Sequence, residues 1–137
     1  MKFKDLSITF HTDKMKECID FYCTHFQATI TFDDGEWYVV IRLQSDNNTQ
    51  PLFLSFQGPN NIYEREDFTG GVSLNLKTEN VEECYRQIKR AGIPFVEEIT
   101  DHEWGDRAFS IKDPIGNLLY IYSDRPIADK YRDAVKD

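Results

Sequence analysis

The sequence predicts an α+β fold made of two tandem βαβββ units, whose curved mixed sheets surround a concave pocket with the helices outside. Three observations lead to it: a pattern repeated at a shift of 66 residues, a strand followed by a helix in each half, and turn signals that divide the remainder into short strands. The 137 residues suit one domain. The expected parts are a first unit at about 3–57, a linker at 58–70, a second unit at about 71–123 and a tail helix at 126–136.

Apolar and polar residues alternate at the beginning of each half. Side chains two apart on a strand share a face, so each segment presents one apolar side and one polar side. The apolar positions are Leu6, Ile8 and Phe10, then Val72, Leu74 and Leu76. The polar positions are Ser7, Thr9 and His11, then Ser73, Asn75 and Lys77.

A helical period follows each opening strand. Spacings of three and four residues place apolar side chains on one stripe of each helix. The stripes are Met15, Cys18, Ile19 and Tyr22 in the first half and Val81, Cys84, Tyr85 and Ile88 in the second. We expect Thr12 and Asp13 to cap the first helix, and Asn80 with Glu83 to form a variant of the capping box at the second. Gly92 predicts the end of the second helix.

Three short strands are expected in the remainder of each half. They lie near 27–33, 36–44 and 51–57 in the first half and near 94–100, 106–112 and 117–123 in the second. Asp34-Gly35 marks a hairpin turn. The run from Asp113 to Asn117, with Pro114 and Gly116 inside it, predicts a tight turn before the last strand.

Charge and cysteine content narrow the classes of partner and compartment. Lys and Arg total 16 and Asp and Glu total 24, and the net charge of −8 disfavours nucleic acid as a partner. No apolar run approaches the length of a membrane span, and the start of the chain lacks the apolar region of a signal peptide. Cys18, Cys23 and Cys84 do not make a disulfide framework. We therefore expect a cytoplasmic protein.

The order of strand, helix and three strands, repeated once, resembles the vicinal oxygen chelate superfamily. That superfamily includes lactoylglutathione lyase, the extradiol dioxygenases and the bleomycin-resistance proteins. The resemblance covers about residues 3–123 and rests on four strings: Asp20-Phe21-Tyr22, Ala91-Gly92-Ile93, the stretch from Trp104 to Phe109, and the turn from Asp113 to Asn117. The last two strings are most similar to the bleomycin-resistance branch.

The resemblance implies which positions to compare with a metal site. Enzymes of the superfamily hold one divalent ion with residues on the first and last strands of each module. The corresponding positions in this sequence are Ser7, Phe53, Ser73 and Tyr120. A free hydroxyl binds divalent ions weakly and a phenyl ring does not bind them. A slip of one residue in the fourth strand would bring Leu52 or Leu54, which are no better. The sequence therefore predicts no metal and no cofactor.

The histidines leave an alternative open. His11 lies near the end of the first strand, His25 at the end of the first helix, and His102 in a loop before Trp104, and we expect all three at the surface or the rim. In the alternative, His11 and His102 collect a metal together with acidic residues such as Glu98 or Asp101. Such a site would suit a metal-dependent lyase, isomerase or dioxygenase.

The polar faces of the first and last strands offer aromatic rings, hydroxyls and an amide, a mixture that suits an organic ligand. Trp37 and Trp104 either wall the mouth of this pocket or pack in the core. Asp106 and Arg107 either orient polar groups of the ligand or form a solvated pair at the strand edge. The candidate ligand-binding residues are Ser7, Thr9, Trp37, Phe53, Ser55, Ser73, Asn75, Trp104, Arg107, Tyr120 and Tyr122.

These observations favour a metal-independent binding protein that sequesters an aromatic or cationic small molecule. The resemblance also implies a homodimer, because metal-free members of the bleomycin-resistance type commonly share their pockets between two chains. Two alternatives to a binding protein remain: a metal-dependent enzyme, and an accessory domain with an empty pocket. Fold alone does not decide between them.

Overall fold

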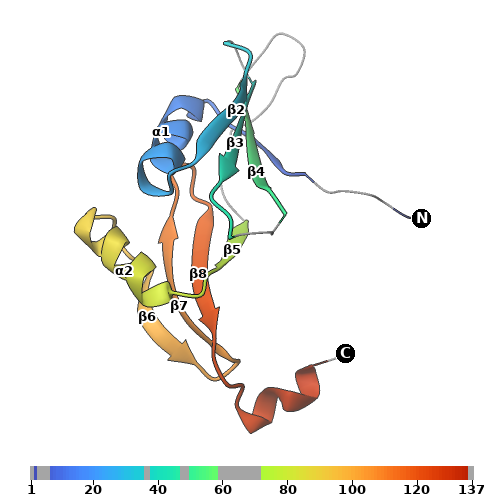
Figure 1. Ribbon diagram of the computed structural model, residues 1–137, viewed down its shortest axis with the longest axis vertical. Helices are drawn as coiled ribbons and strands as arrows, with labels where there is room; N and C mark the ends of the chain where they lie inside the picture. Colours follow the sequence, from blue (N-terminus) through green and yellow to red (C-terminus); the bar gives the residue numbers. More distant parts are fainter. Residues whose placement is uncertain (1, 3–6, 36–37, 47–49, 59–71, 136–137) are drawn as a thin grey trace. The chain divides into compact units, whose positions relative to one another are not determined.

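The computed structural model describes residues 2, 7–35, 38–46, 50–58 and 72–135. The chain forms two compact units, residues 1–69 and 70–137, drawn blue to green and yellow to red in Figure 1. Each unit runs strand, helix, strand, strand, strand, so the predicted tandem βαβββ architecture is confirmed. Trp37 and residues 59–70 of the predicted linker lie outside the described residues.

The first unit contains one mixed sheet and one helix. Its elements are β1 (Thr9–His11), α1 (Met15–His25), β2 (Thr29–Asp33), β3 (Tyr38–Leu43) and β4 (Leu52–Gln57). The strand order is β1-β4-β3-β2, with β1 parallel to β4 and the other pairs antiparallel. The edge strand β2 is exposed along its whole length, including Ile30 and Phe32.

The second unit repeats this plan with longer opening and closing strands. Its elements are β5 (Ser73–Lys77), α2 (Val81–Arg90), β6 (Glu97–His102), β7 (Asp106–Lys112) and β8 (Leu118–Asp124), followed by the short 3-10 helix η1 (Asp129–Ala134). The strand order is β5-β8-β7-β6, with β5 parallel to β8. The short helix η1 lies inside the range expected for the tail.

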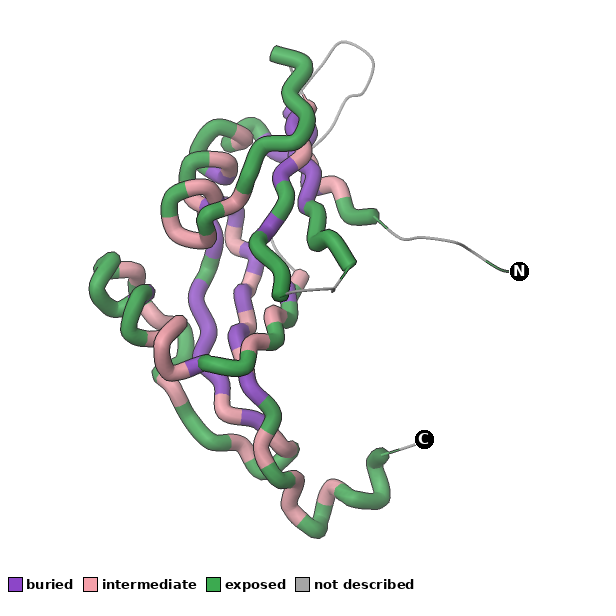
Figure 2. The backbone as a smooth tube through the Cα atoms, viewed as in Figure 1, coloured by how far each residue is buried: buried purple, intermediate pink, exposed green. Residues whose placement is uncertain are grey.

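Each unit buries the apolar face of its sheet against its own helix. In the first unit, Tyr22 of α1 packs on Phe56 of β4 with ring centroids 5.8 Å apart, and Phe10 of β1 lies 5.8 Å from the same ring. In the second unit, Phe109 of β7 contacts Tyr85 of α2 edge-on at 5.6 Å. Figure 2 shows the result as buried stretches along the strands and exposed outer turns on both helices.

The two helices begin differently. Asn80 Oδ1 accepts a hydrogen bond from the backbone N–H of Glu83 at 3.2 Å, so the predicted cap of α2 is confirmed. At α1 the expectation is wrong, because the N-cap is Lys14 and its side chain makes no capping bond. Thr12 instead accepts from Lys14 N–H at 2.9 Å, one residue before the helix starts.

The sixth strand begins later than the predicted 94–100, and this changes the position of His102. Phe95 stacks on Tyr85 at 4.8 Å and meets Phe109 edge-on at 5.7 Å, so this stretch packs against the core before β6 begins at Glu97. The register of β6 against β7 also shifts between Glu97 and Thr100. His102 therefore ends β6 rather than lying in a loop.

Candidate ligand-binding site

The face of the first sheet that points away from α1 carries several predicted site residues. Thr9 pairs with Ser55, and Ser55 pairs with Val40, so these side chains share one face. The alternate residues Phe10 and Phe56 point to the helix. We call this surface the first open face; it consists of Thr9, His11, Tyr38, Val40, Arg42, Phe53, Ser55 and Gln57. Ser7 lies just before β1 and is exposed.

The strand registers correct the expected counterpart of Tyr120 in the first unit. Thr9 faces Ser55 across the parallel pair β1–β4, and Asn75 faces Tyr120 across the parallel pair β5–β8. Because Thr9 and Asn75 are equivalent in the repeat, Ser55 rather than Phe53 corresponds to Tyr120. Sequence spacing misplaced this position because the β3–β4 and β7–β8 connections differ in length.

The second sheet has an equivalent surface, the second open face. Tyr120 pairs with Asn75 on one side and Ser110 on the other, and Tyr122 pairs with Ala108. The face consists of Ser73, Asn75, Lys77, Asp106, Ala108, Ser110, Lys112, Leu118, Tyr120, Tyr122 and Asp124. The structure thus brings Ser73, Asn75, Tyr120 and Tyr122 together within one unit. Ser73 and Asn75 are exposed, and both tyrosines are half-buried.

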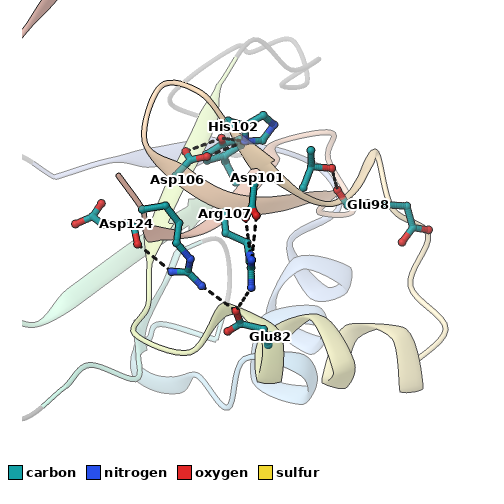
Figure 3. A network of polar contacts seen from close by, with 10 residues as sticks. Glu82, Glu98, Asp101, His102, Asp106, Arg107 and Asp124 are labelled. Atoms are coloured by element: carbon teal, nitrogen blue, oxygen red, sulfur yellow. Dashed lines mark hydrogen bonds and ion pairs between the residues drawn. The ribbon is translucent and has the colours of Figure 1, made fainter. Parts of the chain in front are cut away.

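Asp106 is the centre of the polar network at one end of the second open face. One carboxylate oxygen lies 2.7 Å from His102 Nδ1, and the other accepts from the hydroxyl of Tyr120 at 2.7 Å and from Trp104 Nε1 at 3.1 Å. His102 Nε2 faces Glu97 Oε1 at 2.9 Å. We call this group the Asp106 cluster; Figure 3 shows its centre at His102 and Asp106.

Within this cluster, Trp104 is held as a flat exposed surface. Its indole stacks on the imidazole of His102, with ring centroids 4.1 Å apart and planes 9° apart. Trp104 remains 51% exposed, whereas the His102 side chain is only 9% exposed. The predicted rim position of His102 is therefore wrong, because its ring lies under the indole and between two carboxylates.

Gly105 explains how the chain can place His102 and Asp106 on either side of Trp104. Its φ is +108°, a conformation that residues with a Cβ rarely adopt. A Cβ at this position would lie 3.2 Å from the carbonyl oxygen of Arg125, whose own N–H donates to Gly105 O at 2.8 Å. Sequence analysis missed the cluster, although two polar residues spaced four apart across a Trp-Gly turn were a usable signal.

The hydroxyl of Tyr120 is kept protonated. Burial, followed by the hydrogen bond to Asp106, raises the pKa of Tyr120 to about 12. At neutral pH this side chain is therefore a neutral hydroxyl committed to Asp106, and a poor anionic ligand for a metal.

The donor chemistry at the superfamily's metal positions does not fit a divalent ion. Ser73, Ser55 and Tyr120 offer hydroxyls, and both nitrogens of His102 already face carboxylates. Among the described residues, no group of three or more His, Cys, Asp and Glu side chains could hold a metal.

The acidic residues of the alternative site are also engaged elsewhere. The hydroxyl of Tyr85 donates to Glu98, and Asp101 pairs with Arg107 on the other face of the sheet. His102 points to the second open face through its contact with Asp106. Glu98 and Asp101 therefore do not converge with His102.

Arg107 is not brought together with the other candidate residues. It pairs with Ser123 and so lies on the face covered by α2, opposite Tyr120. Its guanidinium donates to Asp101 Oδ1 at 2.5 Å and to Glu82 Oε1 at 2.7 Å, and Arg125 reaches the same Glu82 oxygen at 2.8 Å (Figure 3). These contacts hold the start of α2 on β7.

Comparisons with known proteins agree with the fold. The model of the Glyoxalase/Bleomycin resistance protein/Dioxygenase superfamily matches residues 6–121. A search of curated proteins finds no match. In the described part of the chain, no helix is long and apolar enough to cross a membrane.

Several solved structures are similar in fold. A virulence protein from Salmonella typhimurium is 16% identical with a TM-score of 0.67, and the match covers 90% of this chain and 99% of that one. Lactoylglutathione lyase from Agrobacterium tumefaciens is 17% identical with a TM-score of 0.64, covering 88% and 92%. A glyoxalase/bleomycin resistance protein/dioxygenase from Nocardioides is 14% identical with a TM-score of 0.67, covering 91% and 86%. At such identities the likeness shows the fold alone.

Proposed function

Because this chain belongs to the Glyoxalase/Bleomycin resistance protein/Dioxygenase superfamily, we propose that it is a metal-independent protein of the bleomycin-resistance type that sequesters an aromatic or cationic small molecule. Members of one fold family differ in chemistry, so the proposal must rest on the side chains of this chain. The resemblance drawn from the sequence to the superfamily is confirmed; the branch belongs to the proposal.

The observation that carries the proposal is the fixed orientation of Trp104. Its Nε1 donates to Asp106 at 3.1 Å, its inner face rests on His102, and about half of its surface is exposed. A large ring held at one angle loses little conformational freedom when a second flat ring stacks on it. A planar ligand therefore suits this surface better than a flexible aliphatic one.

Charge supports the cationic part of the proposal. The chain carries a net charge of −8, and Glu97 lies at the Asp106 cluster with its side chain 45% exposed. A cationic aromatic ligand gains from stacking and from the surrounding field. We propose that the order of affinity among matched planar ligands is cation, then neutral compound, then anion.

The expected homodimer and the cytoplasmic location remain parts of the proposal. The described cysteines Cys18, Cys23 and Cys84 are all free, which suits a reducing compartment. Analytical ultracentrifugation at micromolar concentration would decide between one chain and two.

A fluorescence titration tests the proposed binding. In a Trp37→Phe variant, Trp104 is the remaining tryptophan, so its emission reports directly on ligands that stack there. We expect the emission of Trp104 to change in a saturable way when planar cationic dyes or drugs are added at micromolar concentration. Trp104→Leu should weaken binding of the same compounds about tenfold or more, in line with the loss of one stacking contact. Binding that is unchanged in Trp104→Leu would contradict the proposed site.

Metal analysis tests whether the protein is metal-independent, as we propose. Protein purified without chelator should contain no stoichiometric divalent ion, and ligand binding should survive dialysis against EDTA. One tightly held ion per chain, or affinity lost with the metal, would favour the metal-dependent enzyme instead.

A further inference from the structure

We propose that the side-chain amide of Gln57 is a hydrogen-bond donor that selects ligands with a carbonyl oxygen. The inference rests on the proposed function, since it concerns ligands of the same aromatic class, bound at the first open face of the first unit rather than at Trp104. It names a chemical group that the ligand carries and a residue that recognises it.

Gln57 is the last residue of β4 and belongs to the first open face. It pairs with His11 of β1 on one side and with Tyr38 of β3 on the other, so its backbone is held between two neighbouring strands. Its backbone carbonyl accepts from Thr12 N–H at 3.0 Å. The backbone of Gln57 is therefore well anchored, and the side chain is its only adjustable part.

The amide nitrogen of this side chain has no hydrogen-bond partner among the described residues. Gln57 is 8% exposed, its Nε2 is buried, and no described residue accepts a hydrogen bond from it. By contrast, Nε2 of Gln44 in the same unit donates to the carbonyl of Gln27 at 2.9 Å and lies at the exposed surface. Buried donors are nearly always paired in folded proteins, so an unpaired one calls for a physical explanation.

A donor without a partner lowers the stability of the free protein, because it has lost its water without gaining an acceptor. A ligand oxygen that accepts from it recovers this loss on binding. A ligand of the same shape without the oxygen leaves the donor unpaired, and this asymmetry is how buried polar groups discriminate strongly between similar ligands. Gln57 is therefore suited to specificity rather than to stability.

The neighbours of Gln57 indicate the rest of the ligand. Ser55 and Phe53 follow it at every second position along β4, on the same face and about 6.6 Å apart. Ser55 is buried, whereas Phe53 is 48% exposed. A donor and a hydroxyl beside an exposed phenyl ring match an aromatic ketone or amide, whose ring contacts Phe53 while its oxygen reaches the amide.

The first test measures the free protein. Gln57→Leu removes the unpaired donor at similar size and should raise Tm by about 3 °C. Gln44→Leu is the matched control, because it removes an amide that is already paired, and it should leave Tm unchanged or lower it. A Gln57→Leu protein that melts at or below the wild-type Tm would show that the amide is already satisfied, for example by water, and would overturn the inference.

The second test uses two probes of nearly equal shape, acetophenone and ethylbenzene, which differ in the carbonyl. The side-chain NH2 signals of Gln57 are identified in ¹⁵N-labelled protein by their absence from Gln57→Leu. Acetophenone should shift these signals in a saturable way and ethylbenzene should not. Gln57→Leu should bind acetophenone about tenfold more weakly, while ethylbenzene binding stays the same.

The outcomes separate this inference from the proposed function. If both probes perturb the first open face equally and the Gln57 amide does not respond, the inference is wrong and aromatic binding stands. If neither probe, nor any planar dye, binds either open face, the proposed function fails and the ligand assignment of Gln57 fails with it. The Tm comparison would then still establish whether the amide is unpaired.

Discussion

The two units share one topology but carry different polar side chains at the ends of their open faces. In the second unit, Asp106 accepts from Tyr120 and Trp104 and pairs with His102. In the first unit, the same type of face ends in Gln57, whose amide nitrogen is not hydrogen-bonded to any residue that the structure describes. The repeat therefore keeps which positions share a face, whereas the residues at those positions differ: Ser55 corresponds to Tyr120, and Gln57 corresponds to Tyr122.

The helices show the same divergence. α2 is joined to its sheet by the ring of Tyr85 on Phe109 and also by charge, through Glu82 with Arg107 and Arg125. α1 is joined by aromatic rings, through Tyr22 with Phe56 of β4 at 5.8 Å. Exposed ion pairs contribute little to the free energy of unfolding, whereas buried aromatic rings contribute more. Two helices placed alike on their sheets can therefore be held there with different energies.

The largest expected difference between the units concerns their turns. Asp113 is buried and accepts from the N–H groups of Ile115 and Asn117 at 3.1 and 2.8 Å, and from the Asn117 amide at 2.8 Å. Asp113→Ala leaves these buried donors without an acceptor and should lower the free energy of unfolding by about 3 kcal/mol. Urea denaturation followed by circular dichroism measures this loss.

The control for that prediction is an exposed hairpin turn of the first unit, the one between β2 and β3. Asp34 is exposed and accepts from Tyr38 N–H at 3.1 Å, so water can replace the carboxylate. Asp34→Ala should cost about 1 kcal/mol or less. Equal losses in the two variants would remove the contrast between a buried turn and an exposed one.

A smaller loss is expected when the Asp106 cluster is altered. Asp106→Asn replaces one of the two accepting oxygens with an NH2 donor. Depending on which oxygen is replaced, either His102 loses its partner, or Tyr120 and Trp104 lose theirs. We expect a loss of about 2 kcal/mol, together with a red shift of Trp104 emission. Asp101→Asn alters an exposed carboxylate on the opposite face and should change stability by less than about 1 kcal/mol. An unshifted Trp104 spectrum in Asp106→Asn would argue against its role in orienting the indole.

The helix starts provide a third contrast. Asn80→Ala removes the cap of α2 and should cost about 1 kcal/mol. Lys14→Ala at the N-cap of α1 should cost almost nothing, because Lys14 makes no side-chain capping bond. Thermal denaturation of both variants measures the difference, and a cost at Lys14 as large as that at Asn80 would contradict it.

The smallest effect is confined to alkaline pH. The pKa of Tyr120 is raised from 10 to about 12, first by burial and then by Asp106. The folded state holds this proton more tightly than the unfolded chain, so the stabilisation is complete below pH 10 and is lost as pH rises from 10 through about 12. In absorbance titrations at 295 nm, Tyr120→Phe should lack the latest tyrosinate component. The hydrogen bond to Glu98 also raises the pKa of Tyr85, so Tyr85→Phe is the control and should keep the component of Tyr120. Loss of the latest component in Tyr85→Phe rather than in Tyr120→Phe would contradict the prediction.

Much of the fold was predictable because it depends on local periodicity and turn chemistry. The alternation around Phe10 and Leu74, the cap at Asn80 and the turn at Asp113 are signals within a few residues of chain, and all match the structure. The start of β6 was misplaced because Phe95 packs on Tyr85, a contact between distant residues. Periodicity cannot reveal such a contact.

For the candidate site, the sequence predicted on which face of the sheet each residue lies, but not which side chains contact one another. The side on which Thr9, Ser55 and Tyr120 lie follows from alternation along each strand. The pairing of His102 with Asp106 depends on how tightly the chain turns at Gly105, and the unpaired amide of Gln57 depends on three strands at once. Both are properties of the packed sheet rather than of any short segment.

The edge strands β2 and β6, one from each unit, differ in how readily they can pair with strands of other molecules. β6 displays Glu97, Glu98 and Asp101 along its length, and like charges keep a second such strand at a distance. β2 displays Ile30 and Phe32 with Asp33 as its one acidic residue, so little opposes intermolecular strand pairing there. Aggregation during expression or storage should therefore begin at β2, and a lysine in place of Ile30 should improve the yield of monodisperse protein.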